Sequence, residues 1–211
     1  MVGDVPRPRL YDPDTVLDAV ESLAVRSGPA AVSIRAISAE VGVSNGAVYH
    51  TFSSRGGLMG HAWLRAGRRF LALQTAMVDE VLTKSGKGED AVVAAADAPV
   101  AFAEKFPDSA GLVFSVRREE VLAGDIPDDV AGELRDLERL LVDLMIRLAL
   151  QLWDRKDAAA VDVITSCVVD LPTAMLLHRK RLGNATARKQ LHAAVRAVLT
   201  VGPPPPRRRR A

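Results

Sequence analysis

The sequence has few of the residues that build cross-linked, membrane-spanning or metal-binding proteins. Among its 211 residues is one cysteine, Cys167, so no disulfide can form within the chain, and we expect a cytoplasmic protein. The N-terminal stretch has no apolar signal-peptide core. No uncharged apolar run reaches about 18 residues, so we expect no membrane span. No metal-ligand spacing, phosphate loop or pair of catalytic carboxylates stands out, so we predict no metal, no cofactor and no enzyme activity.

Aromatic residues are also scarce, at 4%, whereas hydrophobic residues reach 48% and are mostly alanine, leucine and valine. This composition favours packed helices, and we predict an all-α protein. The formal net charge is only +2. Through Phe70 eight basic residues stand against six acidic ones, and Arg207–Arg210 form a basic tail. The N-terminal third of the chain is therefore only mildly basic, and its charge alone does not predict nucleic-acid binding.

Capping residues and apolar periodicity predict helices along the chain. Asp12-Pro13 begins the first helix, which ends at Ser27-Gly28-Pro29, and Ser33 caps the second. The polar segment TKSGKGED predicts a loop over residues 83–90. The remaining helices are expected at 55–82, at 91–106 with a kink at Pro99, at 108–122, at 128–153, at 157–182 with an interruption at Pro172, and at 185–200.

Residues 38–52, SAEVGVSNGAVYHTF, fit three interpretations. Asn45-Gly46 between valines is typical of a β-hairpin, but a hairpin among helices would lack a third strand. Gly42 to Gly46 also spells G-x-S-x-G, the nucleophile elbow of serine hydrolases. An elbow needs a buried strand before Ser44, where a capped helix is expected. It also needs a histidine partner, and no local triad forms with any of the four: His50, His61, His178 and His192.

A helix, a tight glycine turn and a second helix explain more of these residues. Gly42 can adopt the left-handed conformation that ends the first helix, and Ser38 is small where the helices cross. Ser44 caps the second helix and leaves its first amides facing outward, which favours phosphate. Between the helices lie Ile37, Val41, Val43 and Val48. A helical hairpin that binds no ligand is the alternative.

The stretch SIRAISAEVGVSNGAVYHTFSSRGGLM resembles the DNA-binding core of the TetR family of bacterial transcription regulators. The resemblance implies a three-helix N-terminal DNA-binding domain and a variable helical domain for ligand binding and dimerisation. It implies that Ser33 touches phosphate, that Tyr49 and His50 meet the backbone or base edges, and that Arg55 faces phosphate. Two residues depart from the family pattern: Asn45 stands where lysine is common, and Thr51 replaces a second aromatic residue.

The expected protein is a dimeric repressor that binds a palindromic double-stranded operator and is released by a small apolar ligand. A regulator that responds to a protein partner, or a helical enzyme or ligand carrier, is the alternative. The expected domains are a flexible N-terminus at 1–11, a DNA-binding domain at 12–61, a ligand-binding and dimerisation domain at 62–201, and a disordered Pro/Arg tail at 202–211.

Three sets of site residues follow. The DNA-binding set is Ser33, Arg35, Ser44, Asn45, Gly46, Ala47, Tyr49, His50, Thr51 and Arg55. The ligand-binding set collects large side chains that can line a cavity: Trp63, Phe70, Phe102, Phe106, Phe114, Met145, Trp153 and Met175. The dimer set collects the apolar faces of the last two helical segments, because the resemblance implies that the final helices pair between subunits: Ile164, Val168, Leu171, Met175, Leu191, Val195 and Val198.

Overall fold

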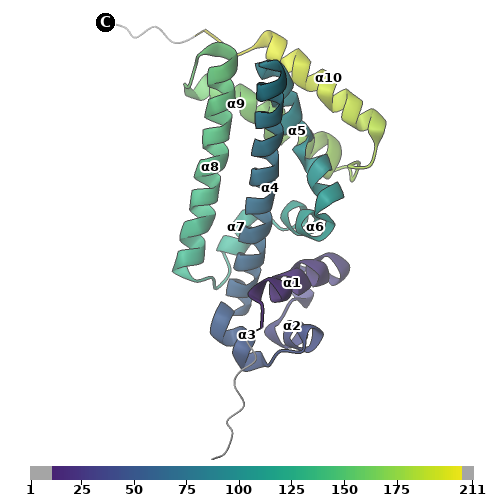
Figure 1. Ribbon diagram of the computed structural model, residues 1–211, viewed down its shortest axis with the longest axis vertical. Helices are drawn as coiled ribbons and strands as arrows, with labels where there is room; N and C mark the ends of the chain where they lie inside the picture. Colours follow the sequence, from purple (N-terminus) through teal and green to yellow (C-terminus); the bar gives the residue numbers. More distant parts are fainter. Residues whose placement is uncertain (1–10, 206–211) are drawn as a thin grey trace, which may run out of the picture.

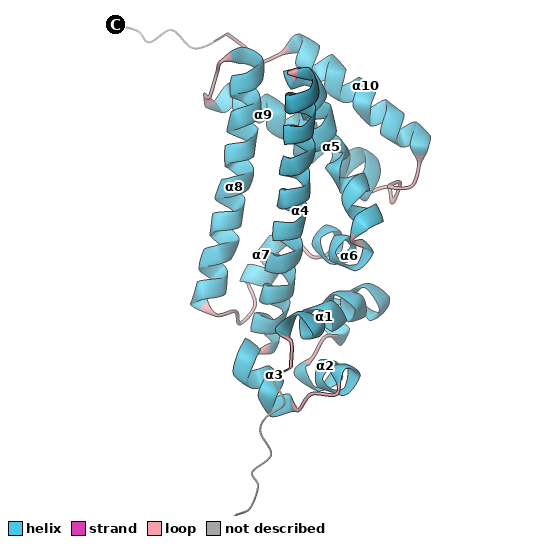
Figure 2. Ribbon diagram, viewed as in Figure 1, coloured by secondary structure: helices cyan, strands magenta, loops and turns pink. Residues whose placement is uncertain are grey.

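The computed structural model describes residues 11–205, and these residues contain helices but no strand (Figure 2). Residues 1–10 and 206–211, which include most of the predicted flexible N-terminus and the arginine tail, lie outside the described residues. The helices are α1 Pro13–Ser27, α2 Ile34–Val41, α3 Asn45–Phe52, α4 Arg55–Ser85, α5 Gly88–Lys105, α6 Pro107–Ser115, α7 Arg118–Leu122, α8 Asp128–Trp153, α9 Ala158–Thr165 and α10 Ala185–Val201.

Side-chain caps explain where several helices begin. The side chains of Asp12, Ser33 and Ser44 accept hydrogen bonds from backbone amides in the first turns of α1, α2 and α3, as the sequence predicts, and Asn184 caps α10 in the same way. Ser54 caps α4 in the same way. Each cap fixes the residue at which the chain turns into a helix, so the boundaries of the N-terminal helices follow from local chemistry.

Helix α4 runs through most of the length of the molecule and connects the N-terminal helices to the remaining ones (Figure 1). Its first half packs with α1–α3, and its second half runs beside α8 and α5. The apolar core around α1–α3 continues through Leu58, Ala62 and Trp63 to Leu112 and Val130 of α6 and α8. A second core joins α4, α5, α8, α9 and α10. Packing therefore crosses the predicted domain boundary near Ala62 without a break.

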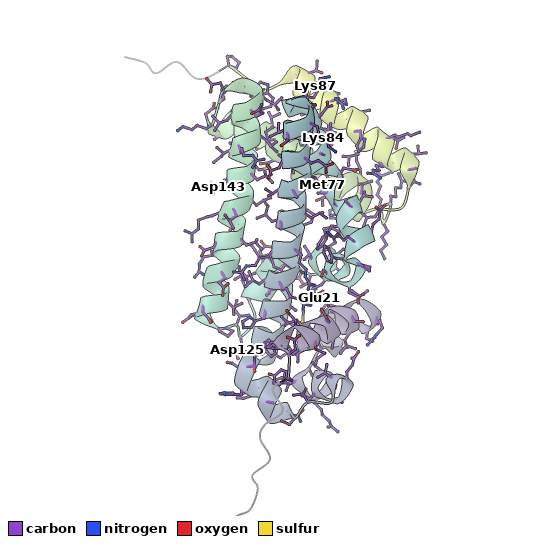
Figure 3. The ribbon with its side chains drawn as sticks, viewed as in Figure 1. Glu21, Met77, Lys84, Lys87, Asp125 and Asp143 are labelled. Atoms are coloured by element: carbon purple, nitrogen blue, oxygen red, sulfur yellow. The ribbon has the colours of Figure 1, made fainter. Side chains whose placement is uncertain are left out.

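Charged residues buried at the joint hold α1 to α4 and α6. The Glu21 carboxylate of α1 is almost fully buried, lies 2.7 Å from the Arg65 guanidinium of α4, and accepts the Ser109 hydroxyl of α6. Arg65 also pairs with Asp18, at 2.6 Å, and with Asp14. Figure 3 shows Glu21 between α1 and α6. The buried Glu21–Arg65 pair and the Ser109 hydrogen bond therefore hold α1 against α4 and α6.

Two predicted helix boundaries are wrong. The expected loop at 83–90 is reduced to Gly86 and Lys87, because Gly86 ends α4 in the left-handed conformation and the acidic first turn of α5 begins at once. The expected helix at 108–122 is split into α6 and α7. Val116 adopts extended backbone between them, and its carbonyl accepts the Trp63 indole hydrogen bond at 2.9 Å.

The helix that begins with α9 is not interrupted at Pro172, contrary to prediction. It continues as far as Leu177 through two π-helical turns, Ser166–Asp170 and Thr173–Leu177. In the second turn the His178 amide donates to the Thr173 carbonyl, five residues earlier, at 2.9 Å. Wider turns accommodate the proline, which has no amide hydrogen to donate.

By length and composition, the continuous stretch Ala158–Leu177 is the only helix of the described residues that could cross a membrane. A helix packed inside a soluble protein passes the same test. Only a third of its most apolar part is buried within the chain, so it presents an apolar surface. The sequence predicts a disordered tail at 202–211, but residues 202–205 contact the fold. The Arg155 guanidinium donates a hydrogen bond to the Pro204 carbonyl at 2.8 Å.

Candidate functional site

Helices α2 and α3 and the turn between them form a helix–turn–helix. Gly42 has a φ of 69°, and the Val43 amide donates to the Ser38 carbonyl at 3.1 Å, which closes the end of α2. Ile37 and Val48 are fully buried between the helices. The helix–turn–helix interpretation of residues 38–52 is therefore confirmed, and the hairpin and the nucleophile elbow are not formed.

The outer face of α3 is polar and open. Asn45, Gly46, Tyr49 and His50 are exposed, and 61% of Tyr49 is accessible. The amides of the first residues of α3 have no acceptor within the helix and point beyond its N-terminus. This arrangement can bring small side chains and backbone amides close to a phosphate or a base edge.

Tyr11 holds the recognition helix α3 from the side. Its hydroxyl donates to the Ala47 carbonyl at 2.9 Å and also contacts the Thr51 hydroxyl. Thr51 in turn donates to the Ala47 carbonyl at 3.3 Å. The Thr51 hydroxyl thus bonds within the chain although the residue is exposed, and the DNA contact expected for it stays a prediction. The sequence predicts Tyr11 to lie in a flexible N-terminus, because no local pattern indicates its contact with Ala47, 36 residues away.

Most arginines of the described N-terminal helices bind the protein itself. Arg55 donates to the carbonyls of Val32 and Pro29, at 2.7 and 2.8 Å, so its guanidinium braces the α1–α2 turn. Two of its donors are thus engaged within the chain, and the expectation that the exposed Arg55 faces phosphate stays a prediction. Arg26 pairs with Glu40 at 2.8 Å, and Arg65 pairs with acids of α1.

Arg35 is different. It is exposed on α2 and has no hydrogen-bond partner among residues 11–205. Ser33, just before it, is half-buried, and its hydroxyl accepts the Ala36 amide at 3.1 Å, which leaves one O–H to donate. Within residues 11–205, most cations of the N-terminal helices thus already have protein partners, and hydrogen-bond donors of α3 stand beside Arg35 on the exposed surface.

An apolar cavity of about 170 Å³ lies between α4, α6, α7 and α8. Of the predicted ligand-binding residues, Trp63 and Phe70 line it. Phe102, Phe106 and Phe114 do not; they form an aromatic cluster behind Phe70, whose ring centroid lies 5.3 Å from that of Phe102. The other predicted residues pack in the second core, away from the cavity: Met145, Trp153 and Met175.

Two charged lining residues escaped sequence reasoning. Arg118 of α7 and Glu138 of α8 contribute apolar surface to the lining, and their charged groups pair at 2.7 Å. Charges in surface-like helical patterns carry no signal for a site, since solvated faces have the same composition. Arg118 reaches the cavity lining because α7 is separated from α6 and packs against α4.

The predicted dimer interface is wrong for four of its residues. Ile164, Val168, Leu191 and Val195 are buried in the chain's own second core, where α9 packs on α8 and the first π-helical turn and α10 pack on α5, so they cannot contact a partner. Leu171, Met175 and Val198 are only partly buried. Exposed large apolar side chains of the described residues include Leu140, Val142 and Leu150 on α8 and Val169 on the π-helical turn, besides Val25 on α1 and Val201 at the end of α10.

Comparison with known proteins agrees with this architecture. Residues 16–62 match the family model of bacterial regulatory proteins, tetR family. No curated protein matches the sequence. Among solved structures, a bacterial regulatory protein in the tetR family from Rhodococcus RHA1 is 19% identical over 92% of this chain and 98% of that chain, with a TM-score of 0.63.

Two further structures share the fold. A transcriptional regulator from Pseudomonas aeruginosa PAO1 is 22% identical over 92% of each chain, with a TM-score of 0.69. The ketosteroid transcriptional regulator KstR2 of Mycobacterium tuberculosis is 14% identical over 94% of this chain and 98% of that chain, with a TM-score of 0.60. The helix–turn–helix segment thus matches the tetR family model, and the chain shares the fold of solved tetR-family regulators over about nine-tenths of its length.

Proposed function

We propose that the protein is a dimeric repressor that binds a near-palindromic operator and is released by a small, largely apolar ligand. The observation that carries the proposal is the continuity of α4. This helix is separated from the recognition helix α3 by only two residues and lines the cavity with Trp63, Gly67 and Phe70. A change in the cavity can therefore reach the DNA-contacting surface through one rigid element.

For DNA contact, α3 enters the major groove with its N-terminus toward the backbone. Asn45 and Gly46 bring the first amides of the helix to a phosphate, and Tyr49 and His50 extend from the same exposed face. Arg35 adds a cation from α2.

For release, a ligand must bind the DNA-incompetent arrangement more tightly than the competent one. The cavity is bounded by α4 on one side and α8 on the other, so an occupant can separate these helices and tilt α4. A typical coupling of about 1–3 kcal/mol would lower operator affinity by about 5- to 150-fold. The name of the similar KstR2, a ketosteroid regulator, is in keeping with an apolar ligand.

For dimerisation, we propose an apolar surface on α8 and the helix that continues α9. Val142, Ile146 and Leu150 recur every four residues on α8, and the first and last are exposed. Val169 is exposed on the neighbouring segment. A two-fold dimer through this surface would place the recognition helices about 34–36 Å apart, or a multiple of that distance.

The DNA half of the proposal is tested with duplexes selected from a random library by the purified protein and then titrated. Asn45→Glu places a carboxylate at the first position of α3. It should not harm the helix, because negative charge is favourable there, yet it should weaken operator binding by about tenfold or more through repulsion of phosphate. The control is Ala193→Glu on the exposed face of α10. Unchanged operator affinity of folded Asn45→Glu would refute the assignment.

The proposal that a ligand releases the protein from its operator is tested with a variant that reduces the volume of the cavity. In Gly67→Ala the new methyl carbon would lie 2.6 Å from Cδ2 of Leu137 and 3.3 Å from the Trp63 ring, so Leu137 must move into the cavity space. Operator binding should persist, while release by a panel of six- to ten-carbon acids, amides and alcohols should weaken. Release of the variant at wild-type concentrations by every active compound would contradict a ligand site at this cavity.

A further inference from the structure

A buried glutamine joins α4 to α5. Only 1% of Gln74 is exposed, and its side-chain amide nitrogen donates to the Ala95 carbonyl of α5 at 3.0 Å. Its Oε1 accepts no hydrogen bond from the described residues. Burial of an amide side chain costs free energy, so the one hydrogen bond that Gln74 donates must serve a carbonyl that would otherwise lack a partner.

Pro99 explains why the Ala95 carbonyl lacks a partner within its own helix. In an α-helix a carbonyl accepts the amide of the residue four positions later. In α5 that residue is Pro99, which has no amide hydrogen to donate. Ala95 and Pro99 are both buried, so bulk water does not reach the carbonyl. Gln74 therefore replaces, from α4, the hydrogen bond that Pro99 removes from α5.

Contacts between α4 and α5 lie on both sides of Pro99. Helix α5 runs back along α4 and packs against it (Figure 1). Before Pro99, Gln74 holds the Ala95 carbonyl. After Pro99, the ring centroid of Phe102 lies 5.3 Å from that of Phe70, which is one helical turn from Gln74 on α4 and lines the apolar cavity. Pressure on Phe70 from within the cavity therefore acts on the part of α5 that follows Pro99.

The part of α5 after Pro99 leads to the DNA-binding helices. It is followed by α6, whose Val113 lines the cavity and whose Ser109 donates to the buried Glu21 carboxylate of α1 at 2.5 Å. A helix that lacks one backbone hydrogen bond at a proline bends most readily at that point. Residues 100–105 and α6 can therefore move together relative to the first part of α5, and their movement would reach α1 through Glu21.

Resting on the proposed function, we propose that Gln74 is a positioning residue for operator binding. By pairing the carbonyl that Pro99 leaves free, it fixes α5 against α4 and sets the tilt at which α4 presents the recognition helix α3. Without this hydrogen bond the chain populates arrangements in which α3 is misplaced. The apparent operator affinity then falls in proportion to the fraction of competent protein.

The test compares the wild type, Gln74→Met, Pro99→Ala and the double variant in full-length protein. Methionine is unbranched and apolar like the stem of glutamine but has no donor. Gln74→Met should lower the midpoint of urea denaturation and weaken binding to the selected operator duplex by about fivefold or more. Pro99→Ala restores the missing amide, so in that background the same methionine should lower neither quantity. Gln190→Met, at an exposed position of α10, should behave as wild type.

A role confined to packing would lower the urea midpoint equally in both backgrounds and leave the operator affinity of the folded protein unchanged. Either result overturns the inference. Operator binding by the wild type without rescue by Pro99→Ala refutes the positioning role alone. If the wild type binds no selected duplex more tightly than random DNA, the proposed DNA-binding function is refuted, while the urea midpoints still decide whether Gln74 replaces the hydrogen bond lost at Pro99.

Discussion

Ser109 donates a hydrogen bond of 2.5 Å to the buried carboxylate of Glu21, across 88 residues of sequence. Glu21 belongs to α1 and Ser109 to α6, so the bond joins the DNA-binding helices to the cavity-bearing part of the chain. The second carboxylate oxygen faces Arg65 of α4 at 2.7 Å. One buried acid thus binds the three helices that meet at this joint.

Glu21→Gln should destabilise the protein by about 2–4 kcal/mol, because Arg65 loses its buried charged partner in a partly desolvated site. Asp18→Asn is the matched control. It removes another carboxylate from the same arginine, but the Asp18 side chain is 66% exposed, so the expected cost is below about 1 kcal/mol. Urea denaturation of the three proteins measures the difference. Equal losses in the two variants would show that burial of Glu21 does not govern this contact.

Gly56 predicts a second effect at the joint. A Cβ at this position would lie 2.1 Å from the carbonyl oxygen of Asp125 and 2.5 Å from its carbonyl carbon, and these backbone atoms cannot rotate away. Gly56→Ala should therefore displace the α7–α8 segment and cost about 1–3 kcal/mol, despite the better helix propensity of alanine.

Gly132→Ala is the control for this change. Gly132 lies within α8, and a Cβ there meets nothing within 4 Å. Alanine should stabilise this position by up to about 1 kcal/mol through helix propensity alone. Thermal denaturation should move the two midpoints in opposite directions. A stabilised Gly56→Ala would mean that the segment around Asp125 does not pack on α4 as described.

The DNA-binding helices were predictable because their determinants are local. Ser44 caps α3 through an amide three residues ahead, and Gly42 ends α2 by its own backbone conformation. The contacts that hold α3 in place are long-range. Tyr11 reaches Ala47 across 36 residues, and Arg55 reaches carbonyls 23 and 26 residues earlier. Periodicity and capping carry no information about such pairings.

Most of the ligand-binding and dimer residues could not be predicted from the sequence, for a related reason. An apolar helix face predicts burial but does not identify what buries it. Leu191 and Val195 have the periodicity of an interface, yet they pack on α5 of the same chain. Phe102 and Met145 are large and apolar, yet they fill cores instead of lining the cavity. Only tertiary packing separates core, cavity and interface.

The oligomeric state gives a third prediction. Val142→Asp should convert the protein to a monomer, because it places a charge in the apolar surface proposed for dimerisation on α8. Val201→Asp is the matched control, since Val201 is exposed at the end of α10 and outside that surface. Light scattering at micromolar concentration measures the mass of each protein. A dimeric Val142→Asp, or a monomeric wild type that still binds operator, would contradict the proposed surface.

His61 predicts how stability depends on pH. It lies on α4 with its ring 5.4 Å from that of Phe52, the last residue of α3, in an edge-to-face arrangement. Its pKa is lowered from 6.5, chiefly because burial disfavours the imidazolium, and Arg68 acts in the same direction against the opposing charges of Asp129 and Glu133. The folded protein therefore binds a proton at His61 less readily than the unfolded chain does.

The sign follows from this difference. Above the unfolded pKa of 6.5 both states are neutral at His61, and the stability is unaffected. As the pH falls below that value the unfolded chain takes up the proton first, so the free energy of unfolding decreases until the folded pKa is passed. Urea denaturation between about pH 7.5 and 5.5 should show this loss, and His61→Gln should reduce it. His178→Gln, at an exposed histidine, should retain the wild-type slope, and a His61→Gln protein with an unchanged slope would show that burial of His61 is not its origin.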